Sequence, residues 1–174
     1  MSDPRYPIGK FTPPADYSAD LRASFVREIA AAPAALTAAV AGLTTDQRLT
    51  PYRDGGWTVA QVVHHVADSH MHAYARLKFA ATEDVPTIKP YNEGVWANFP
   101  DAADANVDSS LRLIESLHAR WAMFLRHLAP EDFERGLMHP ERGPMTVDRM
   151  VALYAWHGRH HAAHITELRK KMGW

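Results

Sequence analysis

The chain has 174 residues, 19 Lys and Arg against 20 Asp and Glu, a formal net charge of −1 and no cysteine. This length is enough to bury one hydrophobic core, so we expect a single domain over residues 1–174. The balanced charge gives no electrostatic reason to bind nucleic acid, and the lack of cysteine excludes disulfides, a catalytic protein thiolate, thiolate-ligated zinc and iron–sulfur clusters.

The N-terminal stretch has no apolar signal core, and no uninterrupted run of about 18 apolar residues occurs along the chain. We therefore expect a cytoplasmic protein with no membrane-spanning segment. Four prolines in this stretch predict an extended arm: Pro4, Pro7, Pro13 and Pro14.

Four amphipathic stretches follow in chain order. Residues 18–43 carry apolar side chains at helical spacing, and Pro33 should kink or divide that helix. The sequence Thr58-Val-Ala-Gln61 has the form of a capping box and should begin a second helix that runs to about residue 82. Asp108 is the expected cap of a third helix ending near residue 128, and Thr146 that of a fourth ending near residue 172.

The connections between these helices are long. Residues 83–107 contain three prolines and should wrap the outside of the domain, with a short helix near residues 93–97. Residues 130–144 form a second loop, in which residues 133–139 suit a short extended piece. Four helices with almost no strand signal predict an all-α fold, a four-helix bundle with long crossover connections.

Histidines are concentrated in the second and fourth helices. In the second helix, periodicity places His65 on the flank of the apolar stripe and His64 nearly opposite it. His65 is therefore the better inward candidate. His70 lies within the stripe and suits a core histidine bonded to a neighbour, whereas His72 lies off the stripe.

The fourth helix contains two overlapping pairs of histidines, each spaced by four residues: His157 with His161, and His160 with His164. Both pairs have the spacing of metal ligands on a helix, so the spacing cannot choose between them. Periodicity alone favours His157 with His161, because the apolar face of the helix is centred near His161.

Several motifs resemble the DinB/YfiT-like superfamily of four-helix metal proteins, and in particular its YfiT branch. The first is Trp57 followed eight residues later by His65, together with the late His160-x-x-x-His164. Further matching stretches are Tyr6-Pro-Ile-Gly9, Thr50-Pro-Tyr-Arg-Asp-Gly-Gly-Trp-Thr-Val59, Ala67-Asp-Ser-His-Met71, Leu117-His-Ala-Arg-Trp121, His139-Pro140 and Ala163-His-Ile-Thr-Glu-Leu168.

The resemblance implies three histidine ligands, one from the second helix and two from the fourth. Matched residue by residue, these are His65, His160 and His164. His157 and His161 would then be core residues or residues that support the ligands. The sequence departs from the wider family pattern at Thr166-Glu167, where Gly-Gln is usual.

Three neutral imidazoles leave at least one coordination position open, as in catalytic metal sites. Zinc is our first expectation, and nickel or manganese would keep additional waters. The resemblance implies two reactions: transfer of a low-molecular-weight thiol, such as bacillithiol or mycothiol, to an electrophile, or metal-dependent hydrolysis. We favour the thiol S-transferase, with hydrolysis as the alternative. A non-enzymatic, stress-related metal- or ligand-binding bundle is the third hypothesis.

No side chain stands out as a general base, which suits attack by a thiolate better than hydrolysis. Glu167 and Asp68 are the carboxylates considered for that role, and both suit a solvated or supporting position. Arginines are candidates for binding carboxylates of a thiol substrate: Arg53, Arg76, Arg120 and Arg159.

We also expect a homodimer. The YfiT resemblance extends along the whole chain, and three aromatic residues expected to be exposed need cover that one small domain would not supply. They are Trp96, Phe99 and Trp174.

Overall fold

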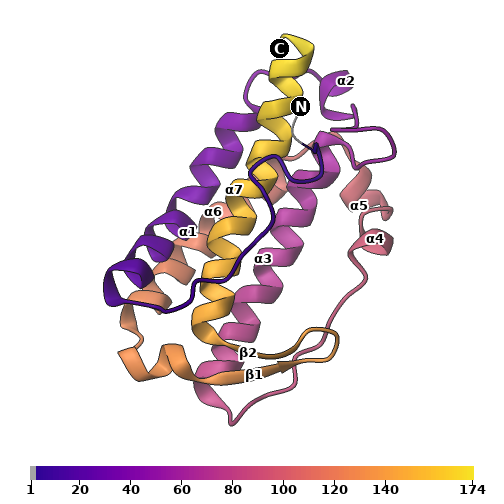
Figure 1. The fold of residues 1–174 in the computed structure, drawn as a ribbon. Coiled ribbons are helices and arrows are strands. Elements are labelled where there is room, and N and C mark those ends of the chain that lie inside the picture. Colours follow the sequence, from indigo (N-terminus) through magenta and orange to yellow (C-terminus); the bar gives the residue numbers. More distant parts are fainter. Residues whose placement is uncertain (1–2) are drawn as a thin grey trace.

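The computed structural model describes residues 3–174 and confirms the predicted four-helix bundle (Figure 1). The long helices are α1 (Ala19–Val40), α3 (Val59–Thr82), α6 (Asp108–His127) and α7 (Val147–Met172). Both α1 and α3 pack against α6 and α7. The two helices that are consecutive in sequence, α1 and α3, therefore lie diagonally across the bundle, as do α6 and α7.

The direction of the helices explains the long connection. In Figure 1, α1 and α7 run one way along the bundle while α3 and α6 run the other way. Because the neighbours α3 and α6 are parallel, the chain must return along the bundle between them. The returning segment carries α4 (Glu93–Trp96) and α5 (Pro100–Ala103), which confirms the predicted crossover and its short helix.

Capping residues set the helix ends largely as predicted. Thr58 and Gln61 form both hydrogen bonds of the capping box of α3, and Thr146 caps α7 by accepting a hydrogen bond from the backbone of Arg149. Gly173 ends α7 at φ 73°, a conformation that glycine adopts without strain. The expectation for Asp108 was wrong by one residue, since Val107 is the N-cap and Asp108 lies in the first turn of α6.

Pro33 does not divide α1, which continues from Ala19 to Val40. The buried Ile29 and Leu36 lie on either side of the proline and pack in the bundle, which holds the helix together across it. By length and mean hydropathy alone, α1 would also be long and apolar enough to cross a membrane. A core helix of a bundle meets the same criteria, so the length and hydropathy of α1 are only weak evidence for a membrane-spanning helix.

Two apolar clusters form the core, one toward each end of the bundle. The first includes Ile29, Leu77 and Trp121, and the second includes Val63 and Ile165. Along α3, α6 and α7, buried polar residues separate the members of the two clusters, and most of them are histidines: Ser69, His70, His118, His160, His161 and His164. The bundle therefore contains a polar layer between two apolar ones.

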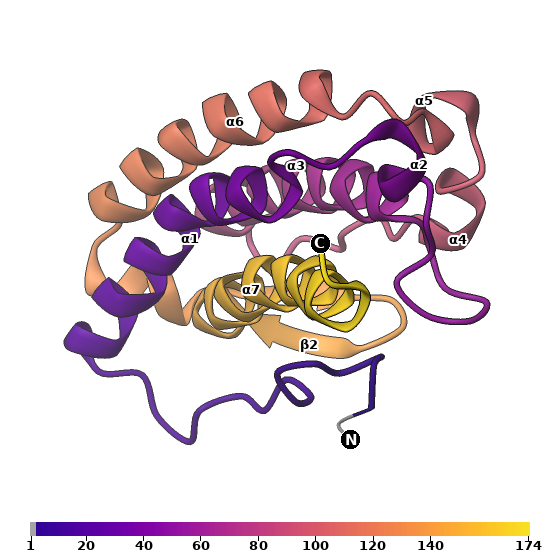
Figure 2. The same cartoon turned by 90° about the horizontal axis from the view of Figure 1, so that it is seen from above.

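Smaller elements close one end of the bundle. The predicted extended piece at 133–139 is a 3₁₀ turn, η1 (Pro130–Glu134), followed by the strand β1 (Gly136–His139). This strand pairs antiparallel with β2 (Gly143–Thr146). Near the other end lies the single turn α2 (Thr45–Arg48). Figure 2 shows the N-terminal arm running along the outer side of α7, as an extended segment.

Only one of the three aromatic residues expected to be exposed is open to solvent. Phe99 is 50% exposed, whereas Trp96 and Trp174 are partly buried. Trp96 packs against the rings of His72 and Tyr91, and Trp174 packs against the second apolar cluster.

Candidate metal centre

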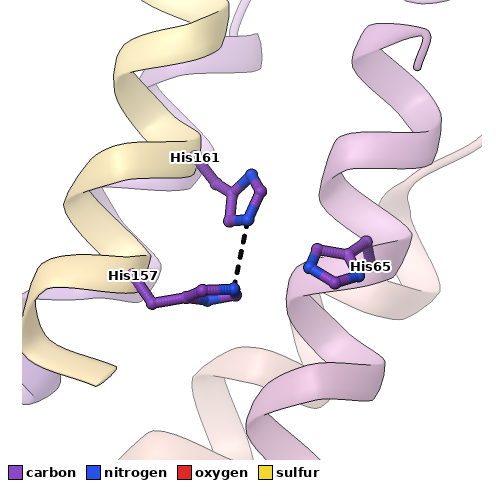
Figure 3. Close-up of side chains that lie close together, drawn as sticks. All are labelled: His65, His157 and His161. Carbon is purple, nitrogen blue, oxygen red and sulfur yellow. Dashed lines mark hydrogen bonds between the residues drawn. The ribbon is translucent and has the colours of Figure 1, made fainter. Parts of the chain in front are cut away.

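The structure brings together His65 of α3 with His157 and His161 of α7 (Figure 3). One ring nitrogen of each lies within 4.8 Å of the others. The ring centroids of His65 and His161 are 4.9 Å apart, and those of His157 and His161 are 4.4 Å apart. Two of the rings come from successive turns of one helix and the third from the facing helix, a common arrangement for a metal site in a bundle.

A chain of hydrogen bonds fixes which nitrogen of His157 is free. The carbonyl of Ile29 can only accept, so Nδ1 of His118 carries a proton and donates to it at 2.6 Å. The other nitrogen of a neutral His118 has no proton and accepts from Nδ1 of His70 at 2.8 Å. Nε2 of His70 then accepts from Nδ1 of His157 at 3.0 Å. Nε2 of His157 is therefore left with a bare lone pair.

A second, looser chain acts on His161. Nε2 of His164 lies 3.3 Å from the carbonyl oxygen of Arg5 and donates to it, which leaves Nδ1 of His164 without a proton. That nitrogen accepts from Nδ1 of His161 at 3.4 Å. Nε2 of His161 is then bare as well. These distances lie at the long end for hydrogen bonds, so this chain is weaker than the one from Ile29.

The two bare nitrogens face each other at 3.2 Å (Figure 3). Two lone pairs at that distance repel, and a proton on either nitrogen would break one of the two chains. A cation between them removes the conflict. Tetrahedral zinc with Zn–N bonds of about 2.0 to 2.1 Å holds its ligand nitrogens about 3.3 Å apart. His157 and His161 therefore fit a bound transition metal, and a ring nitrogen of His65 lies within 4.8 Å of both.

Burial keeps these rings neutral, which is the form that binds metal. It lowers the pKa of His65 to about 4, with a smaller contribution from the charges of His160 and His164. It also lowers the pKa of His157 and His161 well below the usual value, and neighbouring histidines add to the effect. At neutral pH no proton competes for the bare nitrogens.

Of the three ligands implied by the family resemblance, the structure places only His65 in this group. His160 stacks on Trp156 with ring centroids 4.2 Å apart, and His164 lies 4.2 Å from the ring of Tyr52. His160 and His164 are adjacent, at 4.3 Å between centroids, and face the N-terminal arm. The pair favoured by helical periodicity is the one that the structure brings to His65.

Of the remaining histidines of α3, His70 lies as predicted and His64 does not. His70 is fully buried and bonded to His118 and His157, as predicted for a core histidine. His64 was expected to lie away from the core, but it is buried. Its Nδ1 lies 2.7 Å from Oγ of Ser110, and its Nε2 lies 2.9 Å from the carbonyl of Asp104. The apolar stripe did not reveal it because α6 and its preceding loop cover a second face of α3.

His118 was not recognised as a functional candidate from the sequence. It is a single histidine on the apolar face of α6, a pattern that is typical of a core residue. The stretch Leu117-His-Ala-Arg-Trp121 was noticed only as part of the family resemblance. Its partner Ile29 lies 89 residues away, and no local pattern indicates that contact.

A cavity of about 620 Å³ opens over the three histidines and also reaches His160. Its walls come from the N-terminal arm, α3, the crossover segment, the β-hairpin and α7, and they include the aromatic residues Trp57, Tyr91 and Trp156. The hydroxyl of Tyr91 lies 3.5 Å from Nδ1 of His65. A small molecule in this cavity can reach the three histidines and contact these aromatic rings.

Fold and site together have the form of a helical bundle that holds a metal ion between facing helices. The sequence profile of the DinB superfamily matches residues 28–165, and the chain belongs to this superfamily. Proteins of Bacillus cereus and Bacillus anthracis, each named "putative metal-dependent hydrolase", are 51% identical to it over the full length of both chains. YfiT of Bacillus subtilis matches with a TM-score of 0.96 and 45% identity, over 98% of each chain. The published description of YfiT is a "probable metal-dependent hydrolase with an unusual four-helix bundle topology".

Proposed function

We propose that this protein is a metal-dependent enzyme whose metal is held by His65, His157 and His161. The observation that carries the proposal is the pair of bare nitrogens of His157 and His161 at 3.2 Å, with His65 beside them. The names of the Bacillus relatives support the same class of protein. His160 and His164, the ligands implied by the family resemblance, are the competing pair.

Zinc and nickel are the metals that we propose. Three nitrogen ligands suit either ion, and no carboxylate belongs to the histidine group found among residues 3–174. Neutral ligands leave the charge of a divalent ion undiminished. An ion of this kind supplies the positive charge that lowers the pKa of a thiol or a water molecule that it holds.

The reaction that we propose is transfer of a small thiol to an electrophile. The thiol loses its proton to solvent, its sulfur forms a bond to an electrophilic carbon, and the leaving group departs with the electron pair of the broken bond. The protein's own residues orient this exchange. The hydrogen-bonded chain through His70 and His118 fixes the ring of His157, while Trp57, Tyr91 and Trp156 line the cavity in which the reacting groups meet.

Hydrolysis of an ester or amide is the second candidate, and the names of the relatives favour it. It would use a water molecule in place of the thiol and would benefit from a carboxylate as general base. The carboxylates that line the cavity, Glu93 and Glu141, are both exposed. Glu167 pairs with Lys170 on the surface, and Asp68 is not among the cavity residues. This arrangement supports thiol transfer over hydrolysis.

Metal analysis of the untagged protein and five single alanine variants tests the ligand set. We expect about one metal ion per chain in the wild type. His65→Ala, His157→Ala and His161→Ala should lose most of it, because each removes a ligand. His160→Ala and His164→Ala should retain most of it. The opposite result for the two pairs would assign the metal to His160 and His164.

Turnover then separates the reactions. The metal-loaded protein is assayed with several cellular thiols against a chromogenic electrophile, and separately with a chromogenic ester without thiol. We expect conjugation that is lost in His157→Ala and retained in His64→Ala if that variant folds. Ester cleavage without conjugation would favour the hydrolase. No turnover in either assay, from protein that binds metal, would favour a non-enzymatic binding bundle.

A further inference from the structure

Arg76 is a buried cation with no anionic partner. It lies on α3, it is only 8% exposed, and it lines the cavity above the three histidines. One of its terminal nitrogens donates to the carbonyl of Lys89, while its Nε is buried with no partner. Within residues 3–174 no carboxylate lies at ion-pair distance from it. Buried charges are normally paired, because removing them from water is costly.

Other arginines of the chain show what a satisfied guanidinium looks like here. Arg22 makes a two-pronged contact with the carboxylate of Asp148, at 2.9 and 2.7 Å. Arg159 pairs with Glu28, and Arg135 donates to two backbone carbonyls. Among the four arginines considered from the sequence as carboxylate receptors, only Arg76 lines the cavity. The cavity is therefore the side from which an anion can reach Arg76.

The position of Arg76 matches that of a substrate lying along α3. Eleven helical residues turn by about 1,100°, which is within about 20° of three full turns, so Arg76 and His65 share one face of the helix. Their backbone positions are about 16 Å apart at 1.5 Å per residue. Ser69 lies between them on the same cavity wall. Long side chains on a helix lean toward its start, and such a direction for Arg76 shortens the span to be bridged to roughly 10 Å.

The charge of the surrounding wall is also positive. The pKa of His139 is lowered first by burial and then by the charges of Arg142 and Arg76, which lie close to it. Lys10 lines the cavity as well. The acidic residues Glu93 and Glu141 are exposed, so they are well solvated and do not neutralise a charge as deeply buried as that of Arg76.

We infer that Arg76 binds a carboxylate of the substrate, at the opposite end of the cavity from the three histidines. The substrate class is an elongated molecule with a carboxylate about 10 Å from its reacting group. A guanidinium and a carboxylate match in geometry and balance in charge one to one, whereas a phosphate dianion would need further donors. This assignment rests on the proposed function only for the identity of the reacting group.

Calorimetric titration with octanoate and octanol measures the carboxylate contact without any reaction. We expect the wild type to bind octanoate more tightly than octanol. Arg76→Met should weaken octanoate binding between about 10-fold and 100-fold, the loss expected for hydrogen bonds to a charged group, and leave octanol unchanged. The affinity of Arg76→Lys for octanoate should fall between those of the wild type and Arg76→Met. Arg112→Met, an exposed arginine on α6, is the matched control and should change neither.

Thermal unfolding shows whether Arg76 is instead a structural residue. Because Arg76→Met removes an uncompensated buried charge, we expect an unfolding temperature equal to or above that of the wild type. A lower unfolding temperature with octanoate binding unchanged would assign Arg76 to holding the crossover segment through Lys89, and would overturn the inference. Equal affinity of the wild type for octanoate and octanol would overturn it too.

A ligand that carries a thiol at the end of the octanoate carbon chain opposite its carboxylate separates this inference from the proposed reaction. Mercaptooctanoate should bind the metal-loaded wild type more tightly than octanoate, because its sulfur also reaches the histidine centre. If the two bind equally while Arg76→Met still weakens both, the carboxylate site stands and the thiol chemistry does not.

Discussion

His118→Leu tests whether the buried histidine chain controls the metal centre from a distance. His118 is 1% exposed, contacts neither His157 nor His161 in the hydrogen-bonded network, and anchors that network to the carbonyl of Ile29. Leucine fills much of the same space but can neither donate nor accept. The substitution therefore removes the anchor and leaves all three proposed ligands in place.

The expected cost follows from the two partners that His118 satisfies. The carbonyl of Ile29 loses its donor and Nδ1–H of His70 loses its acceptor, and each buried unsatisfied group costs about 1 to 3 kcal/mol. The free energy of unfolding should fall by about 2 to 6 kcal/mol, a large part of the roughly 5 to 15 kcal/mol typical of a domain. Metal affinity should fall about 10-fold to 100-fold, as for other residues that orient a ligand.

Three measurements check this prediction: urea unfolding, competition for zinc with a chromophoric chelator, and nitrogen NMR of the histidines in metal-free protein. In the wild type, His157 should carry its proton on Nδ1, and in His118→Leu it should be distributed over both nitrogens. His118→Gln retains a donor and an acceptor and should recover part of the affinity. His127→Leu, at an exposed position of the same helix, is the control.

A destabilised His118→Leu protein with wild-type zinc affinity and the proton of His157 still on Nδ1 would refute the reasoning. His118 would then be an ordinary core residue, and the tautomer of His157 would be set elsewhere.

Three other predictions concern stability and assembly. Because burial lowers the pKa of His65 to about 4, the unfolded chain binds more protons than the folded chain below about pH 6.5. The free energy of unfolding of metal-free protein, measured with urea, should therefore fall between pH 6.5 and pH 4 by up to about 1.4 kcal/mol per pH unit for each such histidine, and a flat profile would contradict this. Asp148→Asn leaves Arg22 without its buried carboxylate and should cost about 3 kcal/mol in urea unfolding, whereas Glu167→Gln, at an exposed ion pair, should cost less than about 1 kcal/mol. The chain should sediment as a dimer at micromolar concentration and Phe99→Asp should weaken it, whereas a 19.5 kDa species alone would count against the dimer.

Local sequence rules predicted the bundle well because they act within a few residues. The capping box at Thr58 and the cap at Thr146 depend on contacts across three residues, and both helices begin where expected. Pro33 was misjudged because propensity treats the helix in isolation. In the structure, packing of Ile29 and Leu36 maintains the helix through the proline.

The candidate metal centre was only partly predictable for a related reason. The apolar periodicity of the fourth helix indicated His157 and His161, since it reports which face turns inward. The family resemblance indicated His160 and His164, because two pairs with the same spacing overlap in one helix. The chain from Ile29 to His157 could not be predicted, since its links join residues 48 to 89 positions apart.

The crossover between α3 and α6 has a consequence for how such proteins diverge. Packing of the four long helices fixes the histidines, whereas the crossover supplies Pro90, Tyr91 and Glu93 to the wall of the cavity. Surface connections tolerate changes of length and sequence better than the helices they join. A lineage could therefore change which molecules the cavity admits by altering this single segment, while the histidines held by the long helices are inherited unchanged.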